Sequence, residues 1–392
     1  MTRPVAIAGV GDVVPRKGEL VGYLELQADV AAQALADAGL TPADVDGVVF
    51  TRSGYPMAKS VFPSSFAEHL GLTPGWIELA PHGGHQMASI LWRAAGAIRS
   101  GLASVVLVVS ADNRDSRLGR GDVVARIAEQ NMEPEFEVPY GPMFSTNFAL
   151  MAARYLHTYG RDVVDFAHLA VAQRRWARRH PAARMTKDLT VDDVLGSRPI
   201  CSPLRLLDFC LVTDGGAAAV LVDGDRARDL RRDPVYLLGY GDCAESQNIT
   251  SLGDLVEPEL YRRATATAFG MAGIGPADVD LVYPYDPTTS FALWGLEQMG
   301  FAEPGTAGDL AAAGALGPGG SLPTNTHGGL LSYAHPGVAG AALGIVEAVR
   351  QLRGECGDRQ VAGAEVAVTS AIGGFLACGV NVLGGPATRE SA

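Results

Sequence analysis

The segment 323–340 gathers the side chains best suited to acid–base chemistry. It reads PTNTHGGLLSYAHPGVAG and carries Asn325, His327, Tyr333 and His335. The small-residue run AGAALGIVEAVRQLRG that follows predicts a helix beginning at the His-Pro pair, because proline favours the first helical position. Backbone N–H groups at a helix start point outward and stabilise negative charge. The sequence therefore predicts the floor of an active site in this segment.

Composition limits the classes of protein to consider. The chain has 392 residues, 47% hydrophobic and 19% charged, enough for two domains or one large duplicated one. A formal net charge of −12 argues against a nucleic-acid partner. The amino terminus reads as a buried strand and not as a signal peptide, and the apolar runs are too short to span a membrane. Five cysteines without a C-x-x-C pair predict a reduced, cytoplasmic protein with no metal site.

An internal repeat predicts the architecture. Residues 38–46 read AGLTPADVD and residues 272–280 read AGIGPADVD, with seven of nine positions identical. An alanine-rich helical pattern precedes each copy, and a continuous apolar strand follows it. Such strands alternating with helices indicate sheets buried on both faces. We expect two similar α/β halves, 1–235 and 236–392, with a loop and helical insertion at about 112–200.

The motifs resemble those of a known family. The duplicated halves, the segment CSPLRLLDFCLVTDGGAAAVLV at 201–222, and NTHGG followed by HPGVAG resemble the thiolase superfamily over nearly the whole chain. The branch most similar is that of the sterol-carrier-type thiolases and their bacterial lipid-transfer-protein relatives. The resemblance implies a duplicated α/β fold with five layers, α-β-α-β-α, and two mixed five-stranded sheets. It also implies a homodimer that acts on acyl-coenzyme A thioesters.

Two departures from the family pattern concern its catalytic cysteines. Gly84 stands where the resemblance places the nucleophilic cysteine at a helix start, so no acyl-enzyme can form there. Ala371, in A-I-G-G, replaces the second cysteine. The resemblance leaves His335 to hydrogen-bond the thioester oxygen and backbone amides near Gly84 and Gly374 to form an oxyanion site. The electrostatic part of thiolase chemistry is retained, and the covalent part is lost.

Two tyrosines are candidates for the missing acid–base groups. Tyr285 stands where thiolases carry the asparagine of a short N-E-A-F motif, and Tyr333 lies two residues before His335. A phenol takes a proton from a β-hydroxyl group, or protonates a carbanion, when neighbours lower its pKa from about 10. The pattern resembles the lipid-transfer-protein aldolases of steroid side-chain degradation, which use no cysteine. The alternative for Tyr285 is simple packing at the end of an apolar strand.

Other polar residues have both a functional and a structural interpretation. His327 either lines the substrate site or holds a loop, and His85, beside Gly84, either contacts substrate or is an ordinary loop histidine. Asn325 fits a turn-fixing role better than a chemical one. A basic cluster in this acidic chain either binds the phosphates of coenzyme A or forms a solvated helix face. Its members are Arg174, Arg175, Arg178, Arg179 and Arg184, and the first three are the candidate phosphate contacts.

The resemblance implies a specific reaction and specific partners. We expect retro-aldol cleavage of a β-hydroxyacyl-CoA, steroid side-chain thioesters included, to a ketone and a shorter acyl-CoA. Coenzyme A is then part of the substrate, and no permanently bound cofactor is expected. A small OB-fold protein with a zinc ribbon is the implied partner, in a heterotetramer. The alternatives are a non-catalytic acyl-CoA-binding scaffold and a cysteine-independent condensing acyltransferase.

Overall fold

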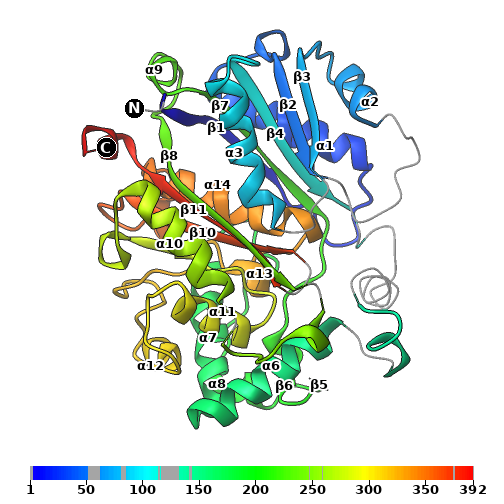
Figure 1. Ribbon diagram of the computed structural model, residues 1–392, viewed down its shortest axis with the longest axis vertical. Helices are drawn as coiled ribbons and strands as arrows, with labels where there is room; N and C mark the ends of the chain where they lie inside the picture. The colour runs from blue at the N-terminus through cyan, green and yellow to red at the C-terminus, as the bar shows by residue number, and fades with distance from the viewer. Residues whose placement is uncertain are drawn as a thin grey trace.

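The computed structural model describes residues 3–51, 62–80, 85–113, 115, 132–140, 144–246, 248–257, 259–373 and 376–391. Within this part of the chain, nine strands form one sheet in the order β3-β2-β4-β7-β1-β8-β11-β10-β9 (Figure 1). The strands are β1 (Val5–Val13), β2 (Gly47–Thr51), β3 (Trp76–Ala80), β4 (Val105–Asp112), β7 (Gly215–Asp223), β8 (Val235–Ser246), β9 (Leu281–Tyr283), β10 (Val366–Gly373) and β11 (Leu376–Gly384). A separate two-stranded sheet pairs β5 (Pro199–Cys201) with β6 (Leu204–Arg205).

The sheet consists of two halves with the same pattern of strand directions. In the first, β2 pairs in parallel with β3 and β4, and β7 runs antiparallel to β4 and β1. In the second, β9 pairs in parallel with β10, and β11 runs antiparallel to β10 and β8. The four strands β9, β10, β11 and β8 of the second half therefore correspond to β2, β4, β7 and β1 of the first, as the sequence repeat implies.

The predicted count of two five-stranded sheets is wrong in two respects. First, β1 and β8 pair at Ala6–Tyr236 and Ile7–Val235, and this short contact joins the halves into one sheet. Second, the fifth strand of the second half is reduced to one parallel bridge between Val282 and Thr324. The boundary proposed near residue 235 falls where β8 begins, and it stays a prediction.

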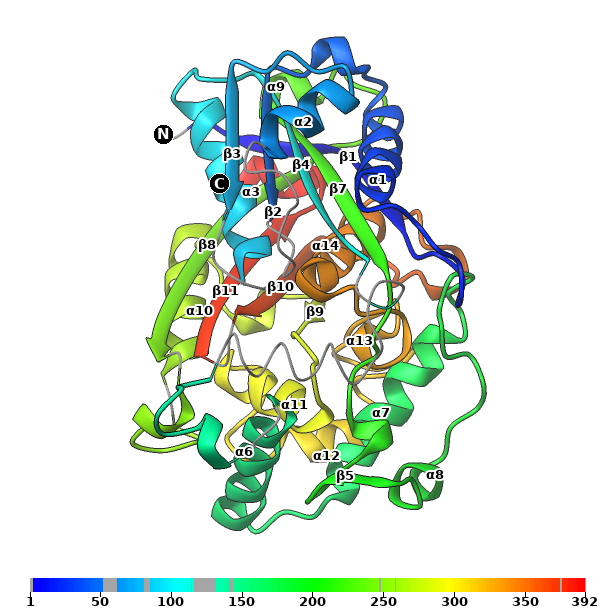
Figure 2. The same cartoon turned by 90° about the vertical axis from the view of Figure 1, so that its right-hand side faces the viewer.

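Helices complete a five-layer α-β-α-β-α arrangement, which confirms the predicted fold class. The central layer is α3 (Gln86–Arg99) with α14 (Gly340–Leu352), and each packs against strands of both halves. Outside the first half lies α1 (Tyr23–Ala38), and outside the second lies α10 (Leu260–Ala272). Figure 2 shows α14, in orange, crossing the centre of the molecule between the strands of both halves.

The repeated sequence motif has the same local structure in both copies. Gly39 and Gly273 end α1 and α10 in the left-handed conformation, with φ of 74° and 70°, which favours glycine. The last aspartate of each copy then ties two strands together. Asp46 accepts the backbone N–H of Val105 at 2.8 Å, and Asp280 accepts that of Val366 at 2.9 Å. The identities between the copies thus have a structural cause.

A helical layer covers the lower end of the second half in Figure 1. Its helices are α6 (Phe144–Tyr159), α7 (Val164–Ala177), α8 (Val191–Leu195), α11 (Thr289–Gln298), α12 (Ala307–Ala312) and α13 (Gly329–Ser332). Two further α-helices within the described residues are α2 (Phe62–His69) and α9 (Gly224–Ala227). In the described part of the chain, none of the helices is long and apolar enough to cross a membrane.

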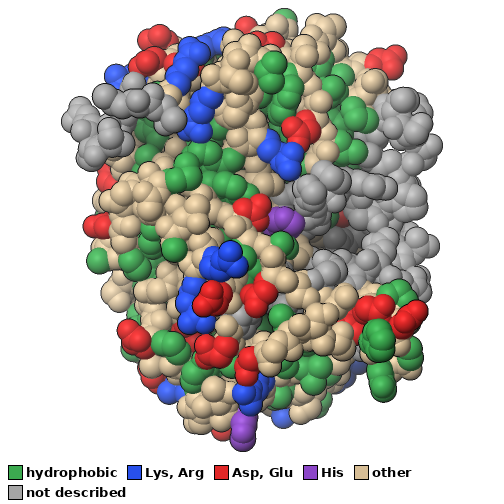
Figure 3. All heavy atoms as spheres, viewed as in Figure 1, with side chains coloured by type: hydrophobic (Ala, Val, Ile, Leu, Met, Phe, Trp, Pro, Cys, Tyr) green, Lys and Arg blue, Asp and Glu red, His purple; other side chains and the backbone are tan. Residues whose placement is uncertain are grey.

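Acidic and basic side chains are interspersed on the face of the molecule shown in Figure 3.

Candidate active site

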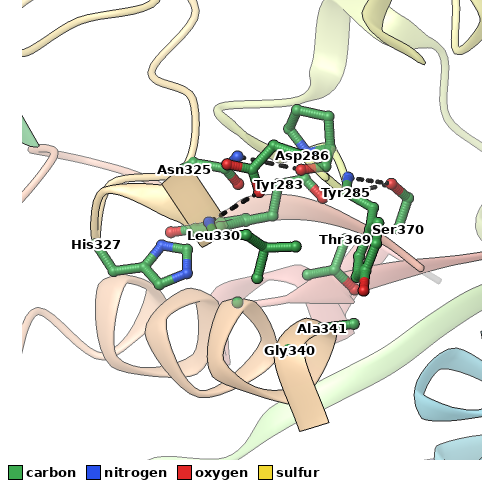
Figure 4. A pocket seen from close by; sticks show the side chains of 12 residues that line it. Tyr283, Tyr285, Asp286, Asn325, His327, Leu330, Gly340, Ala341, Thr369 and Ser370 are labelled. Carbon is green, nitrogen blue, oxygen red and sulfur yellow. Dashed lines mark hydrogen bonds between the residues drawn. The ribbon is translucent and has the colours of Figure 1, made fainter. Parts of the chain in front are cut away.

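A small pocket lies where β9 ends, between the loop 325–330 and the first turns of α14 (Figure 4). Tyr285 and Asp286 line it from the segment after β9, and His327 from the facing loop. The Tyr285 backbone N–H donates to Ser370 Oγ at 3.0 Å, which fixes the tyrosine against β10. Tyr285 keeps only 9% of its surface exposed, so its hydroxyl group works in a largely dry environment.

Tyr285 and His335, separated by fifty residues in sequence, form a hydrogen-bonded pair. The Tyr285 hydroxyl lies 3.0 Å from His335 Nε2. On the other side of the ring, Nδ1 lies 3.2 Å from the carbonyl oxygen of Leu211. Because a carbonyl can only accept, Nδ1 carries the proton of the neutral ring and Nε2 accepts from the phenol. The geometry therefore suits proton transfer from Tyr285 to His335.

The segment 208–214 fastens these two residues to each other. The Cys210 N–H donates to the Pro287 carbonyl at 3.0 Å, just after Tyr285. The Leu211 N–H donates to the Leu330 carbonyl at 3.0 Å, and the His335 N–H donates to Thr213 Oγ1 at 3.0 Å. Backbone hydrogen bonds of this kind hold a site more firmly than side-chain packing alone, and they preset the imidazole for its partner.

The expected helix start at the His-Pro pair is displaced by several residues. A 3-10 turn at Gly337–Ala339 follows Pro336, and α14 begins only at Gly340. Gly337 has φ of 59°, outside the helical region, which explains why the helix cannot begin at the proline. The His335 ring instead packs against the first residue of α14, where only a glycine leaves room for it.

Tyr333 is placed differently from Tyr285. It is 2% exposed, and its hydroxyl donates to Asp12 Oδ2 at 2.6 Å. Arg350 binds the other oxygen of the same carboxylate at 2.7 Å. Burial, and then the negative charge of Asp12, raise the pKa of Tyr333 well above its usual value. Tyr333 is therefore held as a neutral phenol, and the geometry favours Tyr285 as the proton acceptor.

Two buried histidines flank the Tyr333 ring. The ring centroid of His180 lies 4.4 Å away, and that of His327 lies 5.2 Å away in an edge-on arrangement. Burial lowers the pKa of each histidine to about 4, so both are neutral at physiological pH. His327 also lines the pocket, and its Nδ1 finds no hydrogen-bond partner among the described residues. An unsatisfied buried nitrogen at this place supports the predicted substrate contact of His327.

Asp286 ties the Tyr285 loop to the helix that precedes Tyr333. Its two carboxylate oxygens accept the N–H groups of Leu330 at 3.0 Å and Leu331 at 3.3 Å, at the start of α13. Burial raises the pKa of this carboxyl to about 8, although these hydrogen bonds oppose the rise. The structure therefore keeps a carboxylic acid largely neutral beside the pocket.

The raised pKa of Asp286 predicts a pH-dependent stability. In the unfolded chain the carboxyl ionises near pH 4, whereas in the folded protein it stays protonated up to about pH 8. Between these values the folded state binds the extra proton, so its stability falls as the pH rises. Asp286→Asn removes this titration. Urea unfolding at about pH 5 and about pH 8 should show the wild type losing several kcal/mol relative to the variant at the higher pH.

An exposed aspartate serves as the control for that experiment. Asp192 lies on the surface in the first turn of α8, and Asp192→Asn should leave the pH dependence unchanged. Equal pH slopes for the wild type and Asp286→Asn would contradict the burial argument.

The other predicted site residues are placed as follows. Asn325 has φ of 48°, and its side-chain N–H donates to the Pro284 carbonyl at 3.1 Å, contacts that fix the turn. His85 immediately precedes α3 and is half-buried. Gly84 and Gly374, the predicted oxyanion positions, lie outside the described residues. Among the described residues, no group of three or more His, Cys, Asp or Glu residues is placed to hold a metal ion.

The three arginines predicted to meet phosphate do not lie together. Arg174 is 5% exposed, and its guanidinium donates to Ser332 Oγ at 3.0 Å and to the Lys187 carbonyl at 3.1 Å. An arginine turned inward in this way is not available to a phosphate on the surface. Arg175 and Arg178 are exposed, and Arg178 forms an ion pair with Asp188. Their contact with coenzyme A stays a prediction.

Three residues near the pair were not foreseen. Asp12, from the end of β1, binds Tyr333, and Asp286 caps α13. Cys210 places its sulfur 3.1 Å from His335 Nδ1. Only Asp286 had a usable signal, because an acidic residue follows the apolar strand directly beside Tyr285.

Comparison with known proteins shows which proteins this chain resembles. A family model described as thiolase C-terminal domain-like matches residues 241–384. A 17-hydroxy-3-oxo-4-pregnene-20-carboxyl-CoA lyase from Mycobacterium tuberculosis is 36% identical over 94% of this chain and 96% of its own length. A steroid side-chain-cleaving aldolase from Thermomonospora curvata is 34% identical over 89% of this chain and 90% of its own.

A solved structure described as the Ltp2–ChsH2(DUF35) aldolase is similar in three dimensions. It superposes with a TM-score of 0.87 and 31% identity, and the match covers 98% of each chain. The match thus extends over both halves of the sheet and the helical layer below them.

Proposed function

Because this chain belongs to the thiolase superfamily, in the branch of sterol-carrier-type thiolases and lipid-transfer-protein aldolases, we propose that it is a carbon–carbon lyase acting on acyl-CoA thioesters. It cleaves a β-hydroxyacyl-CoA by a retro-aldol reaction to a ketone and a shorter acyl-CoA. The observation that carries this proposal is the hydrogen bond of 3.0 Å between the Tyr285 hydroxyl and His335 Nε2 beside the pocket. Gly84 and Ala371 replace the cysteines of a thiolase, so a covalent route is closed.

In the first step the substrate β-hydroxyl group gives its proton to Tyr285. Tyr285 passes its own proton to His335 Nε2, so the base that finally holds the charge is the imidazole. The Cα–Cβ bond then breaks, the oxygen forms the ketone, and the electron pair moves into the thioester as an enolate. The Leu211 carbonyl, which accepts from Nδ1, stabilises the imidazolium that results.

In the second step the enolate takes up a proton at Cα. The imidazolium returns its proton to Tyr285, whose phenol protonates the carbon, and the pair is restored to its starting state. The positive charge on His335 and backbone amides near Gly84 and Gly374 stabilise the enolate oxygen until then. The reaction is redox-neutral and consumes no co-reactant. It therefore needs no permanently bound cofactor, and coenzyme A enters and leaves as part of the thioester.

Steroid side-chain thioesters are the proposed substrate class. Two relatives more than 30% identical over most of the chain carry names that specify a steroid CoA lyase and a steroid side-chain-cleaving aldolase. A tertiary β-hydroxyl group, as in a 17-hydroxysteroid, suits this chemistry because its cleavage gives a ketone directly. We assign the predicted coenzyme A contacts to the exposed Arg175 and Arg178 in preference to Arg174.

A second protein is the proposed partner. The similar aldolase of known structure is named together with ChsH2 (DUF35), which supports a partner for this chain as well. We propose a small OB-fold protein with a zinc ribbon, assembled with a homodimer of this chain into a heterotetramer. Five cysteines without a C-x-x-C pair continue to support a cytoplasmic location.

The test is direct product analysis. The purified protein, alone and with a separately expressed OB-fold protein of the proposed kind, is incubated with branched and steroidal β-hydroxyacyl-CoAs. Mass spectrometry should detect a ketone and a shorter acyl-CoA in equal amounts. Tight substrate binding without any product, in either pairing, would instead identify a non-catalytic acyl-CoA-binding subunit. Net formation of a longer acyl-CoA would identify a condensing enzyme.

A further inference from the structure

The thiol of Cys210 lies against the catalytic imidazole. Its sulfur is 3.1 Å from His335 Nδ1, and the Leu211 carbonyl oxygen is 3.2 Å from the same nitrogen. Because Leu211 can only accept, the Nδ1 proton lies between two acceptors, a carbonyl oxygen and a sulfur. The contact is set by the backbone, since the Cys210 N–H is bonded to the Pro287 carbonyl at 3.0 Å.

We propose that Cys210 is a positioning residue of the site, whose sulfur holds His335 with Nε2 toward Tyr285 and stabilises the ring when it is positively charged. This inference rests on the proposed function, in which His335 becomes an imidazolium during turnover. The neutral ring donates its Nδ1–H toward the Cys210 sulfur, and a hydrogen bond of this kind stabilises negative charge as it develops on the sulfur during attack on an electrophile. Cys210 is then also the thiol of this chain most reactive toward electrophiles.

The other cysteines provide the comparison. Cys243, Cys356 and Cys378 are buried, and burial raises the pKa of each thiol, which makes them slow to react. Cys201, in β5, is half-buried like Cys210 and so has similar access to a small reagent. It is the matched control for reactivity.

The first experiment measures labelling and requires no lyase activity. The protein is treated with iodoacetamide. The cysteine sulfur attacks the CH2 carbon of the reagent and displaces iodide, and the thiol proton passes to solvent. Peptide mass spectrometry should show Cys210 labelled at least about tenfold faster than Cys201. In His335→Gln that advantage should disappear, while the rate at Cys201 stays the same. Labelling of Cys210 that is unaffected by His335→Gln overturns the proposal.

The second experiment measures the role in turnover. Cys210→Ala should lower kcat by about 10- to 100-fold with little change in KM, because a hydrogen bond to a charged group is lost. Cys210→Ser, which keeps an acceptor in the same place, should recover most of that loss, and Cys201→Ala should match the wild type. A kcat of Cys210→Ala equal to the wild type overturns the proposal. If neither the wild type nor any variant has lyase activity, but labelling of Cys210 still depends on His335, the result supports the contact between the two residues and contradicts the proposed function.

Discussion

Tyr285→Phe is expected to lower kcat by about 10²- to 10⁴-fold, the usual contribution of a positioned acid–base group. The substitution removes the hydroxyl that lies 3.0 Å from His335 Nε2 and nothing else. Without it, the imidazole has no proton path to the substrate, whereas the ring still fills its place against β10. KM should therefore change little. Steady-state kinetics with a β-hydroxyacyl-CoA would measure both constants.

Tyr333→Phe is the matched control. It also removes one phenolic hydroxyl group, from a tyrosine that lies two residues before His335 in the sequence. That hydroxyl is already committed to Asp12 at 2.6 Å and is buried. The variant should keep kcat within about tenfold and lose about 1–3 kcal/mol of stability, the cost of an unmade buried hydrogen bond. A large loss of kcat in Tyr333→Phe with near wild-type turnover in Tyr285→Phe would reverse the assignment of the base.

Gly340→Ala is expected to lower kcat by about 100-fold or more, although no reacting group is touched. A Cβ atom at this position would lie 2.7 Å from Cδ2 of His335 and 3.3 Å from Nε2. The ring has no room to retreat, because Nδ1 is held by Cys210 and Leu211 on its far side. A displacement of about 1 Å at a catalytic group costs about this much in rate.

Gly344→Ala tests whether this effect is specific. It lies one turn further along α14, and its Cβ would meet Tyr283 at 3.7 Å, an ordinary contact distance. Alanine also favours the helix over glycine by about 0.5–1 kcal/mol. The variant should be at least as stable as the wild type and keep kcat within about threefold. If both alanine variants lose activity equally, the contact with His335 is not the cause.

The architecture was largely predictable from the sequence, and the reason is the repeat. Two copies of one motif, each followed by a strand, place β2 and β9 at equivalent positions, and Asp46 and Asp280 show why the copies are alike. The continuity of the sheet was not predictable. It depends on two residue pairs between β1 and β8, which lie far apart in sequence and carry no distinctive pattern.

The sequence predicted which residues belong to the site, but it did not predict which of them contact each other. Tyr285, Tyr333 and His335 were all expected, but only the fold decides which tyrosine meets the histidine and which meets Asp12. The burial of Arg174, in contrast, could have been predicted from helical periodicity. The residue lies four residues after Ala170 and three before Ala177, both buried, and so shares the inner face of α7. Cys210 had no such signal, because a single cysteine 125 residues from His335 gives no hint of contact.

The most direct test of the central claim is the isotope content of the shorter acyl-CoA formed in D2O. Retro-aldol cleavage through the Tyr285–His335 pair predicts one solvent deuteron at Cα of that product, an equal amount of ketone, and no requirement for added coenzyme A. Cleavage that occurs only when free coenzyme A is supplied, or a short acyl-CoA without solvent deuterium, would contradict it.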